Sequence, residues 1–396
     1  MTAGGKIMKK ASLLMSVIFL LIIPMLHIYG EEITSDRDRA IDGSKSAVLM
    51  EQDTGKLLMD KNIHEQLPPA SMTKVMTLLL IMEELDKGNI KLNEKVRISE
   101  NASSMGGSQV FLETGEEMSI ENLIKSIAIA SGNDASVAMA ERISGSEEVF
   151  VEKMNKKVKE LNLENTHFKN SSGLPAKNHY STAYDMAVIS RELLKYEYVT
   201  DYTSIYEDYL RKGTDNEFWL VNTNKLVKFY PGVDGLKTGF TNEAKYCLTA
   251  TAKKNNMRVI TVVMGAESPK ERNKMVSSML DYAFNHYETK KLYDKGQTIA
   301  ELDSLKSNKN KIDVVTSQPV SVLLKKGEEL DHIETSYTIK NNLKLPLEKN
   351  TQVGILTVKS KTKTLSKIPL VTNDQIDRAS YLTLFKRSLK KIAKYN

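Results

Sequence analysis

The chain has one cysteine, Cys247, among its 396 residues, which excludes an intrachain disulfide and a cysteine-rich metal site. Its six histidines show no His-x-x-x-His or similar spacing of the kind that metal ligands adopt on a helix. From these two shortages we expect neither a metal ion nor another cofactor.

Long hydrophobic runs are also scarce. The run near the N-terminus, Ala11–Leu26, is shorter than the roughly 20 residues needed to span a bilayer. Three lysines precede it, while Gly30 and two glutamates follow it, which is the order found in a secretory signal. We expect residues 1–30 to be a signal peptide and the body of the protein to be exported. Because Ile28 makes the cleavage site imperfect, an uncleaved anchor is the alternative.

The body of the chain lacks an excess of charge of either sign. The net charge is +6, of which residues 1–30 carry +3 and residues 382–396 carry +5, leaving −2 for everything between them. A nearly neutral body argues against a nucleic-acid-binding surface, which needs clustered lysine and arginine. The length and the 41% of apolar residues favour two folded domains with tails.

Residues 36–288 mix strand-like and helical patterns. Two hairpins are expected, one at Asp53-Thr54-Gly55-Lys56 and one at Asn255-Asn256. Segments with apolar residues at helical spacing predict helices, among them one capped by Ser119 and one opened by Ser268-Pro269. Helices packed on an antiparallel sheet make this an α+β domain.

Residues 289–380 have a different composition. They hold five runs rich in β-branched residues, separated by turn residues, which predicts a small β-sandwich-like domain. The runs are Ile312–Thr316, Val320–Leu324, Ile333–Lys340, Val353–Lys359 and Leu365–Thr372. No catalytic pattern is visible there, and we expect a spacer or packing module.

The last segment, residues 381–396, predicts an amphipathic helix. Leu382, Phe385, Leu389 and Ile392 fall on one helical face, and five basic residues occupy the rest. A helix of this kind lies in the membrane interface, so we expect the tail to bind the membrane surface. A solvated or domain-packed helix is the alternative.

The first sign of chemistry is the stretch that contains Ser71 and Lys74. Prolines before it and apolar spacing after it place the two residues at a helix N-terminus, three residues apart on one face. A lysine can take the proton of a serine hydroxyl if burial or a nearby cation lowers its pKa. Alone, the Ser-x-x-Lys pattern is weak, because it recurs at Ser360/Lys363 and Ser388/Lys391.

Two further motifs follow in order along the chain. Ser131-Gly132-Asn133 falls in a tight loop between two expected helices, the second of which Asp134 can cap. Alone, this motif is also weak, because Ser99-Glu100-Asn101 has the same Ser-x-Asn pattern, whereas Lys237-Thr238-Gly239, at the start of a strand hairpin, occurs once. In this order, the three motifs are similar to those of the penicillin-binding proteins and class A β-lactamases.

The residues around the motifs narrow the resemblance. They read Pro69-Ala70-Ser71-Met72-Thr73-Lys74, Ser131-Gly132-Asn133-Asp134-Ala135 and Asp234-Gly235-Leu236-Lys237-Thr238-Gly239. These stretches resemble the serine-type D-alanyl-D-alanine carboxypeptidases among the low-molecular-mass penicillin-binding proteins. The resemblance implies a β-lactamase/transpeptidase-like catalytic domain over residues 36–288. The β-rich module and the basic tail also resemble that family's architecture, in which the tail holds the enzyme on the outer face of the cytoplasmic membrane.

The resemblance also implies catalytic roles. Ser71 would be the nucleophile that forms an acyl-enzyme with the penultimate D-alanine carbonyl of a peptidoglycan stem pentapeptide, and Lys74 would be its base. Ser131 would relay the proton to the departing D-alanine. The backbone N–H groups of Ser71 and Phe240 would form the oxyanion hole. β-Lactam antibiotics would acylate the same serine and act as covalent inhibitors.

Other residues are implied as substrate-binding. Asn133 would hydrogen-bond the substrate amide or orient the catalytic lysine. Lys237 and Thr238 would hold the terminal carboxylate, with help from Arg272 in the first turn of a helix. Gly239 would let its strand approach the substrate without a Cβ.

Two alternatives remain open at this point. A β-lactamase or a transpeptidase of the same superfamily would use the same acylation. No Glu-x-x-x-Asn stretch, of the kind that activates the deacylating water in class A β-lactamases, lies between Ser131 and Lys237, so we expect penicillin to leave Ser71 slowly. The other alternative is a non-enzymatic, membrane-tethered cell-wall-binding protein, against which the intact motifs argue.

Overall fold

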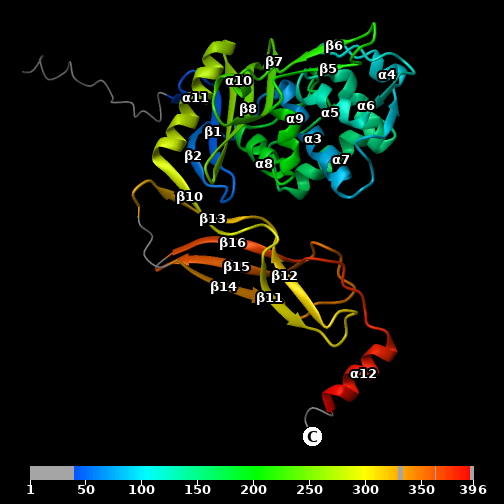
Figure 1. Cartoon of the computed structure of the whole chain (residues 1–396). Helices are drawn as coiled ribbons and strands as arrows, with labels where there is room; N and C mark the ends of the chain where they lie inside the picture. The colour runs from blue at the N-terminus through cyan, green and yellow to red at the C-terminus, as the bar shows by residue number, and fades with distance from the viewer. Residues whose placement is uncertain (1–39, 329–332, 362, 393–396) are drawn as a thin grey trace, which may run out of the picture. The chain divides into compact units, whose positions relative to one another are not determined.

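The computed structural model describes residues 40–328, 333–361 and 363–392. The expected signal peptide, residues 1–30, lies outside the described residues. The described residues from 43 onward belong to one unit, which contains the elements below. Its first part combines an antiparallel sheet with helices, and its second part is built from strands (Figure 1). The predicted α+β class is confirmed.

The first sheet has five antiparallel strands in the order β2-β1-β9-β8-β7. Their bounds are β1 (Ser46–Glu51), β2 (Leu57–Lys61), β7 (Val233–Thr241), β8 (Lys245–Lys254) and β9 (Met257–Ala266). Both expected hairpins form, with Gly55 at φ 70° and Asn255 at φ 53°, a region that glycine and asparagine tolerate in turns. Because β7 is at the edge, one side of its backbone is free of sheet partners.

Helices cover both faces of this sheet. Helix α11 packs against one face and α8 against the other (Figure 1). The helices of this part are α3 (Lys74–Asp86), α4 (Glu100–Ser103), α5 (Ile120–Ala128), α6 (Asn133–Ser144), α7 (Glu147–Glu160), α8 (Ala183–Leu193), α9 (Thr200–Thr203), α10 (Leu226–Phe229), α11 (Pro269–His286) and the 3-10 turns η2 (Ala70–Thr73) and η3 (Glu197–Val199). Helix α3 is buried almost throughout and is the centre of the apolar core.

Two antiparallel strand pairs also belong to this part. They are β3 (Lys95–Arg97) with β4 (Glu117–Ser119), and β5 (Glu207–Leu210) with β6 (Phe218–Val221).

Local capping explains where several helices begin. Ser119 accepts the N–H of Asn122 at the start of α5, and Ser268 accepts the N–H of Glu271 at the start of α11, as predicted. The prediction for Asp134 was wrong. Helix α6 begins at Asn133 with Gly132 as its N-cap, two residues before the predicted cap, and the carboxylate of Asp134 instead accepts N–H groups from a distant loop.

The second part begins directly after α11. Strands pair as a five-stranded sheet, β11-β12-β16-β15-β14, and a two-stranded sheet, β10-β13, around a core of their own. The strands are β10 (Tyr287–Tyr293), β11 (Thr298–Asp303), β12 (Lys311–Thr316), β13 (Val320–Lys325), β14 (Glu334–Ile339), β15 (Gln352–Ser360) and β16 (Lys363–Thr372). The five predicted runs correspond to β12 through β16. Strands β10 and β11 were not predicted, because charged residues interrupt their apolar pattern and only pairing with β13 and β12 specifies them.

The last described element is α12 (Tyr381–Ile392). Leu382, Phe385 and Leu389 are 64%, 62% and 51% exposed, as expected for an unburied apolar face. The side chain of Ile392 lies outside what the structure describes. Arg387 donates hydrogen bonds to backbone oxygens, among them that of Ser307 at 2.6 Å. Among the described residues, no helix combines the length and apolarity that a bilayer crossing requires.

Candidate active site

Ser71 lies in the 3-10 turn η2, immediately before α3 begins at Lys74. The expectation of a helix start is therefore correct, although the serine is in the tighter turn rather than in the α-helix. The Nζ atom of Lys74 lies 3.2 Å from the hydroxyl of Ser71. Ser71 is half-buried and Lys74 is fully buried, so the hydroxyl can be reached from outside while the amine cannot.

The other contacts of Lys74 indicate where its lone pair points. Nζ lies 2.6 Å from Oδ1 of Asn133 and 2.6 Å from the backbone oxygen of Ser172. The amide of Asn133 is oriented by its Nδ2, which donates to the backbone oxygen of Gly106, so Oδ1 must face the lysine. A neutral amine has two N–H donors, and these two oxygens accept both. The remaining lone pair then faces the hydroxyl of Ser71.

The electrostatics of the site favour that neutral amine. Burial, and after it the positive charge of Lys237, lowers the pKa of Lys74 well below its ordinary value, while the carboxylate of Asp134 opposes the shift. A deprotonated lysine is the form that can accept a proton from serine. The pair Ser71 and Lys74 thus has the geometry of a nucleophile with its base, and the lowered pKa of Lys74 favours the form that can act as that base.

The second motif occupies the turn between α5 and α6. Ser131 adopts φ 65°, and both Ser131 and Asn133 are buried. The N–H of Asn133 donates to the backbone oxygen of Ser108, so a loop before α5 fixes the start of α6. Through Asn133 and its contact with Lys74, this motif meets the first motif directly. Ser131 lies two positions before Asn133, in the same turn.

The third motif lies on the edge strand β7, where Lys237 and Thr238 converge on a residue that the sequence did not reveal. Thr223 Oγ1 accepts hydrogen bonds from Nζ of Lys237 at 3.2 Å and from Oγ1 of Thr238 at 2.7 Å. Thr223 follows β6 and belongs to none of the three motifs. No sequence spacing distinguishes it, since its position depends on the segment after β6, where the N–H of Thr223 donates to the backbone oxygen of Ile129 and the side chain of Asn224 donates to that of Gly235 in β7.

Two buried cations lie near the end of this strand. Burial, and after it the charge of Arg272, lowers the pKa of Lys237 to about 7. The guanidinium of Arg272 is itself buried and donates to the amide oxygen of Asn273. Within the described part of the chain, neither cation forms an ion pair. Two buried positive groups without an anionic partner form a suitable site for a carboxylate.

Close backbone approaches hold the serine turn against its neighbours. A Cβ on Gly239 would lie 2.8 Å from the backbone oxygen of Pro69, so glycine allows β7 to approach the turn itself. A Cβ on Gly173 would lie 1.9 Å from the backbone oxygen of Ala70. Phe240 follows in β7, half exposed, with its ring stacked on Tyr246 of β8.

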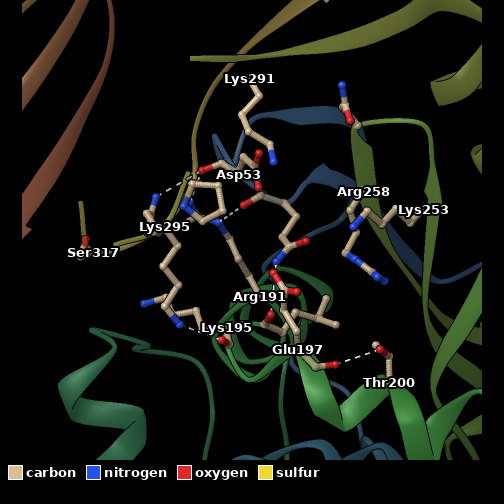
Figure 2. Close-up of a pocket in the computed structure, with 15 residues that line it drawn as sticks. Asp53, Arg191, Lys195, Glu197, Thr200, Lys253, Arg258, Lys291, Lys295 and Ser317 are labelled. Atoms are coloured by element: carbon tan, nitrogen blue, oxygen red, sulfur yellow. Dashed lines mark hydrogen bonds between the residues drawn. The ribbon is translucent and has the colours of Figure 1, made fainter. Parts of the chain in front are cut away.

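A separate cavity of about 110 Å³ shares none of the predicted site residues (Figure 2). On its wall, Arg191 donates to the backbone oxygen of Asp53, and Arg258 forms an ion pair with Asp234. These charged groups are engaged within the fold, and we assign the cavity no part in the candidate active site. Among the described residues, no group of acidic, histidine and cysteine side chains could hold a metal ion.

Comparison with known families gives two matches along the chain. Residues 33–268 match the family described as D-alanyl-D-alanine carboxypeptidase, peptidase S11. Residues 287–378 match the C-terminal domain of penicillin-binding protein 5.

Individual proteins are similar over most of the chain. The D-alanyl-D-alanine carboxypeptidase DacF of Bacillus subtilis is 58% identical over 87% of this chain and 89% of its own length. DacA of Escherichia coli is 33% identical over 85% of each chain. Penicillin-binding protein 5 from Haemophilus influenzae superposes with a TM-score of 0.66 at 31% identity, covering 85% of this chain and 98% of its own.

A further solved structure carries an antibiotic. Penicillin-binding protein D2 from Listeria monocytogenes, in its ampicillin-bound form, has a TM-score of 0.55 at 29% identity, and covers 61% of this chain and 98% of its own.

Proposed function

The chain belongs to the D-alanyl-D-alanine carboxypeptidase family, and we propose that Ser71 is the nucleophile with which it removes the terminal D-alanine from peptidoglycan stem pentapeptides. The observation that carries this assignment is the buried Lys74 amine, whose two hydrogens are taken by Asn133 and Ser172. Its lone pair is left for the hydroxyl of Ser71, 3.2 Å away. No other arrangement of these donors and acceptors satisfies a neutral amine.

In the acylation step, the oxygen of Ser71 attacks the penultimate D-alanine carbonyl while Lys74 takes the hydroxyl proton. The C–N bond to the terminal D-alanine then breaks, and the leaving nitrogen receives a proton through Ser131. Water hydrolyses the resulting ester and restores the free hydroxyl. The backbone N–H groups of Ser71 and Phe240 stabilise the oxyanion, which can contribute about 3–4 kcal/mol per donor.

Substrate binding rests on the free edge of β7. An extended peptide can add to such an edge as a further strand, with Asn133 facing it from the opposite side. The terminal carboxylate then meets Lys237, Thr238 and Arg272. Binding an anion there raises the pKa of Lys237 from about 7, so the lysine is charged in the complex.

The decisive experiment is release of D-alanine from a pentapeptide ending in D-Ala-D-Ala. Ser71→Ala should abolish release, whereas Ser360→Ala, in the matched Ser-x-x-Lys pattern of β15 and β16, should leave it unchanged. Full activity of Ser71→Ala would remove this serine from the mechanism.

Penicillin supplies an independent test of the same site. We expect a fluorescent penicillin to label Ser71 and to remain attached for many turnovers of a peptide substrate. The Ser71→Ala variant should not be labelled, whereas the Ser360→Ala variant should be labelled like the wild-type protein. Rapid steady hydrolysis of penicillin with little trapped adduct would instead indicate a β-lactamase.

We also propose the division of the chain as a signal peptide over 1–30, a catalytic domain over 36–288, a β-rich domain over 289–380 and a membrane-binding tail over 381–396. Support comes from the end of α11 at His286 and from the separate apolar core of the later strands.

For the tail, the exposed apolar residues Leu382, Phe385 and Leu389 of α12 support attachment to the outer face of the cytoplasmic membrane. Deleting 381–396 should move the mature protein to the soluble fraction. Retention on the membrane would show that the N-terminal segment or another anchor holds it.

A further inference from the structure

Phe111 has an unusual backbone conformation. Its φ is 55°, in the left-handed region, which bulky residues rarely adopt. Its side chain is 65% exposed, so burial of the ring does not compensate for the conformation. An exposed aromatic residue held in an unfavourable conformation needs a surrounding structure that imposes it, and such positions cluster at functional sites.

One part of that surrounding structure is Asp134, the residue after Asn133. Its buried carboxylate accepts the N–H of Val110 at 2.9 Å and the N–H of Leu112 at 3.2 Å. The two residues that flank Phe111 are therefore held by a single side chain at the start of α6.

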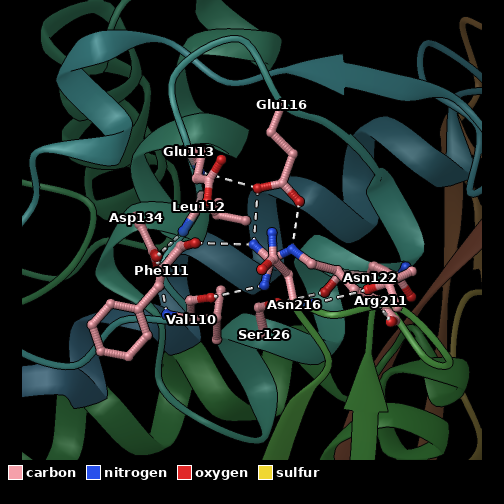
Figure 3. Close-up of polar contacts among 11 residues, drawn as sticks. Val110, Phe111, Leu112, Glu113, Glu116, Asn122, Ser126, Asp134, Arg211 and Asn216 are labelled. Carbon is pink, nitrogen blue, oxygen red and sulfur yellow. Dashed lines mark hydrogen bonds and ion pairs between the residues drawn. The ribbon is translucent and has the colours of Figure 1, made fainter.

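The other part is Arg211, at the end of β5 (Figure 3). Its guanidinium donates to the backbone oxygens of Val110 at 3.2 Å and Phe111 at 3.0 Å, and to both carboxylate oxygens of Glu116. The ion pair neutralises both charges. The backbone of Phe111 is thus clamped from two sides, while its ring lies outside the hydrogen-bonded cluster (Figure 3).

The clamped loop lies against the candidate active site. Its earlier residues Gly106 and Ser108 accept hydrogen bonds from Nδ2 and from the backbone N–H of Asn133, both at 2.7 Å. Asn133 contacts Lys74 on its other side. Phe111 is three residues beyond Ser108 in the same loop, so the clamped segment continues directly from the contact with Asn133.

A second aromatic ring lies next to Phe111. The ring of Phe218 in β6 meets it edge to face, with 5.7 Å between centroids. The two rings together form an aromatic surface beside the Arg211–Glu116 ion pair.

We propose that Phe111, supported by Phe218, forms an apolar subsite for the side chain of the residue that precedes D-Ala-D-Ala in the substrate. The subsite takes long aliphatic side chains, whose methylene groups pack on the exposed ring. This inference rests on the proposed function, because it concerns the acyl half of the same substrate. The clamp by Asp134 and Arg211 holds the backbone of Phe111 in place, so no ordering of the loop backbone is needed on binding.

The test compares two peptides that differ only at this residue, acetyl-alanyl-D-Ala-D-Ala and acetyl-norleucyl-D-Ala-D-Ala, by kcat/KM for D-alanine release. We expect the wild-type protein to prefer norleucine by roughly tenfold. In Phe111→Gly the ratio should fall to near one, and in Phe111→Tyr it should be retained. Glycine is unstrained at φ 55°, so this variant keeps the loop conformation, and an unchanged or higher melting temperature verifies the fold.

Tyr337→Ala is the matched control, because Tyr337 is an exposed aromatic residue of β14. It should leave the ratio unchanged. Equal rates on both peptides in the wild-type protein, or a tenfold preference that survives in Phe111→Gly, would overturn the subsite while leaving the proposed function intact. Absence of D-alanine release from either peptide by the folded wild-type protein would overturn both.

Discussion

Thr223 offers the sharpest test of the carboxylate site, because the three motifs do not include it. Its hydroxyl accepts hydrogen bonds from the ammonium of Lys237 at 3.2 Å and from the hydroxyl of Thr238 at 2.7 Å. Thr223→Val keeps the shape of the side chain and removes the acceptor. Both donors then lose a fixed partner, and the group that binds the substrate carboxylate is no longer held in place.

The size of the effect follows from the charged hydrogen bond. A hydrogen bond to a charged group contributes about 1.5–3 kcal/mol. If this is lost in the transition state, kcat/KM should fall roughly 10- to 150-fold, at about 1.4 kcal/mol for each tenfold change. The hydroxyl also favours the charged form of Lys237. Removing the hydroxyl of Thr223 should therefore lower the pKa of Lys237 further, below about 7. The alkaline fall of kcat/KM should then occur at a lower pH.

The assay is D-alanine release measured across pH for three variants. Thr223→Ser, which keeps the hydroxyl, should restore most of the activity and the original pH profile. Thr261→Val is the matched control, because within the described chain the buried hydroxyl of Thr261 in β9 has no hydrogen-bond partner, so its loss should be neutral or stabilising. Activity of Thr223→Val within twofold of wild type, with an unmoved alkaline limb, would show that Thr223 only fills space.

The pKa shifts at the site predict that kcat/KM falls above about pH 7, because Lys237 loses its charge, and that it falls at low pH, because Lys74 becomes protonated. A kcat/KM that stays constant from pH 7 to 9 would contradict this. Gly173→Ala should unfold at a lower temperature and lose penicillin labelling, because the added Cβ would collide with the backbone oxygen of Ala70, next to Ser71. Gly213→Ala is the control: the space around Gly213 is open, so the free energy of unfolding should fall only by the roughly 1 kcal/mol that its positive φ costs. Burial lowers the pKa of His179 to about 4, so on acidification the unfolded chain binds a proton at this histidine before the folded chain does. The contribution of His179 to the free energy of unfolding is therefore full above about pH 6.5, and it falls by about 3 kcal/mol towards pH 4. Urea unfolding at several pH values measures this loss, and His179→Gln should flatten it.

Much of the fold depends on local chemistry that can be read along the chain. The hairpin at Gly55 forms because glycine adopts positive φ in its turn, and α11 begins where Ser268 can cap it. Strands β10 and β11 were not predicted in this way. Their charged residues give no clear strand pattern, and only pairing with β13 and β12 specifies them.

The candidate site divides in the same way. Ser71 and Lys74 are one helical turn apart, so the 3.2 Å contact between them is available to any chain that folds this turn. Asp134 shows the limit of such reasoning. It was expected to cap α6, but its carboxylate accepts hydrogen bonds from N–H groups more than 20 residues away in the chain. No local sequence pattern indicates these long-range hydrogen bonds.

The sequence by itself indicated the candidate chemistry of this protein: a serine with a lysine as its proposed base, an asparagine loop and a basic strand, in an order similar to that of the penicillin-binding proteins and class A β-lactamases. The tertiary structure alone decided which groups complete it. Thr223 meets Lys237, and Arg211 meets the backbone of Phe111 across 100 residues of sequence, because separate elements pack side by side. Hydrogen bonds within one turn are fixed by residue spacing, whereas those between elements exist only once the core has placed the elements together.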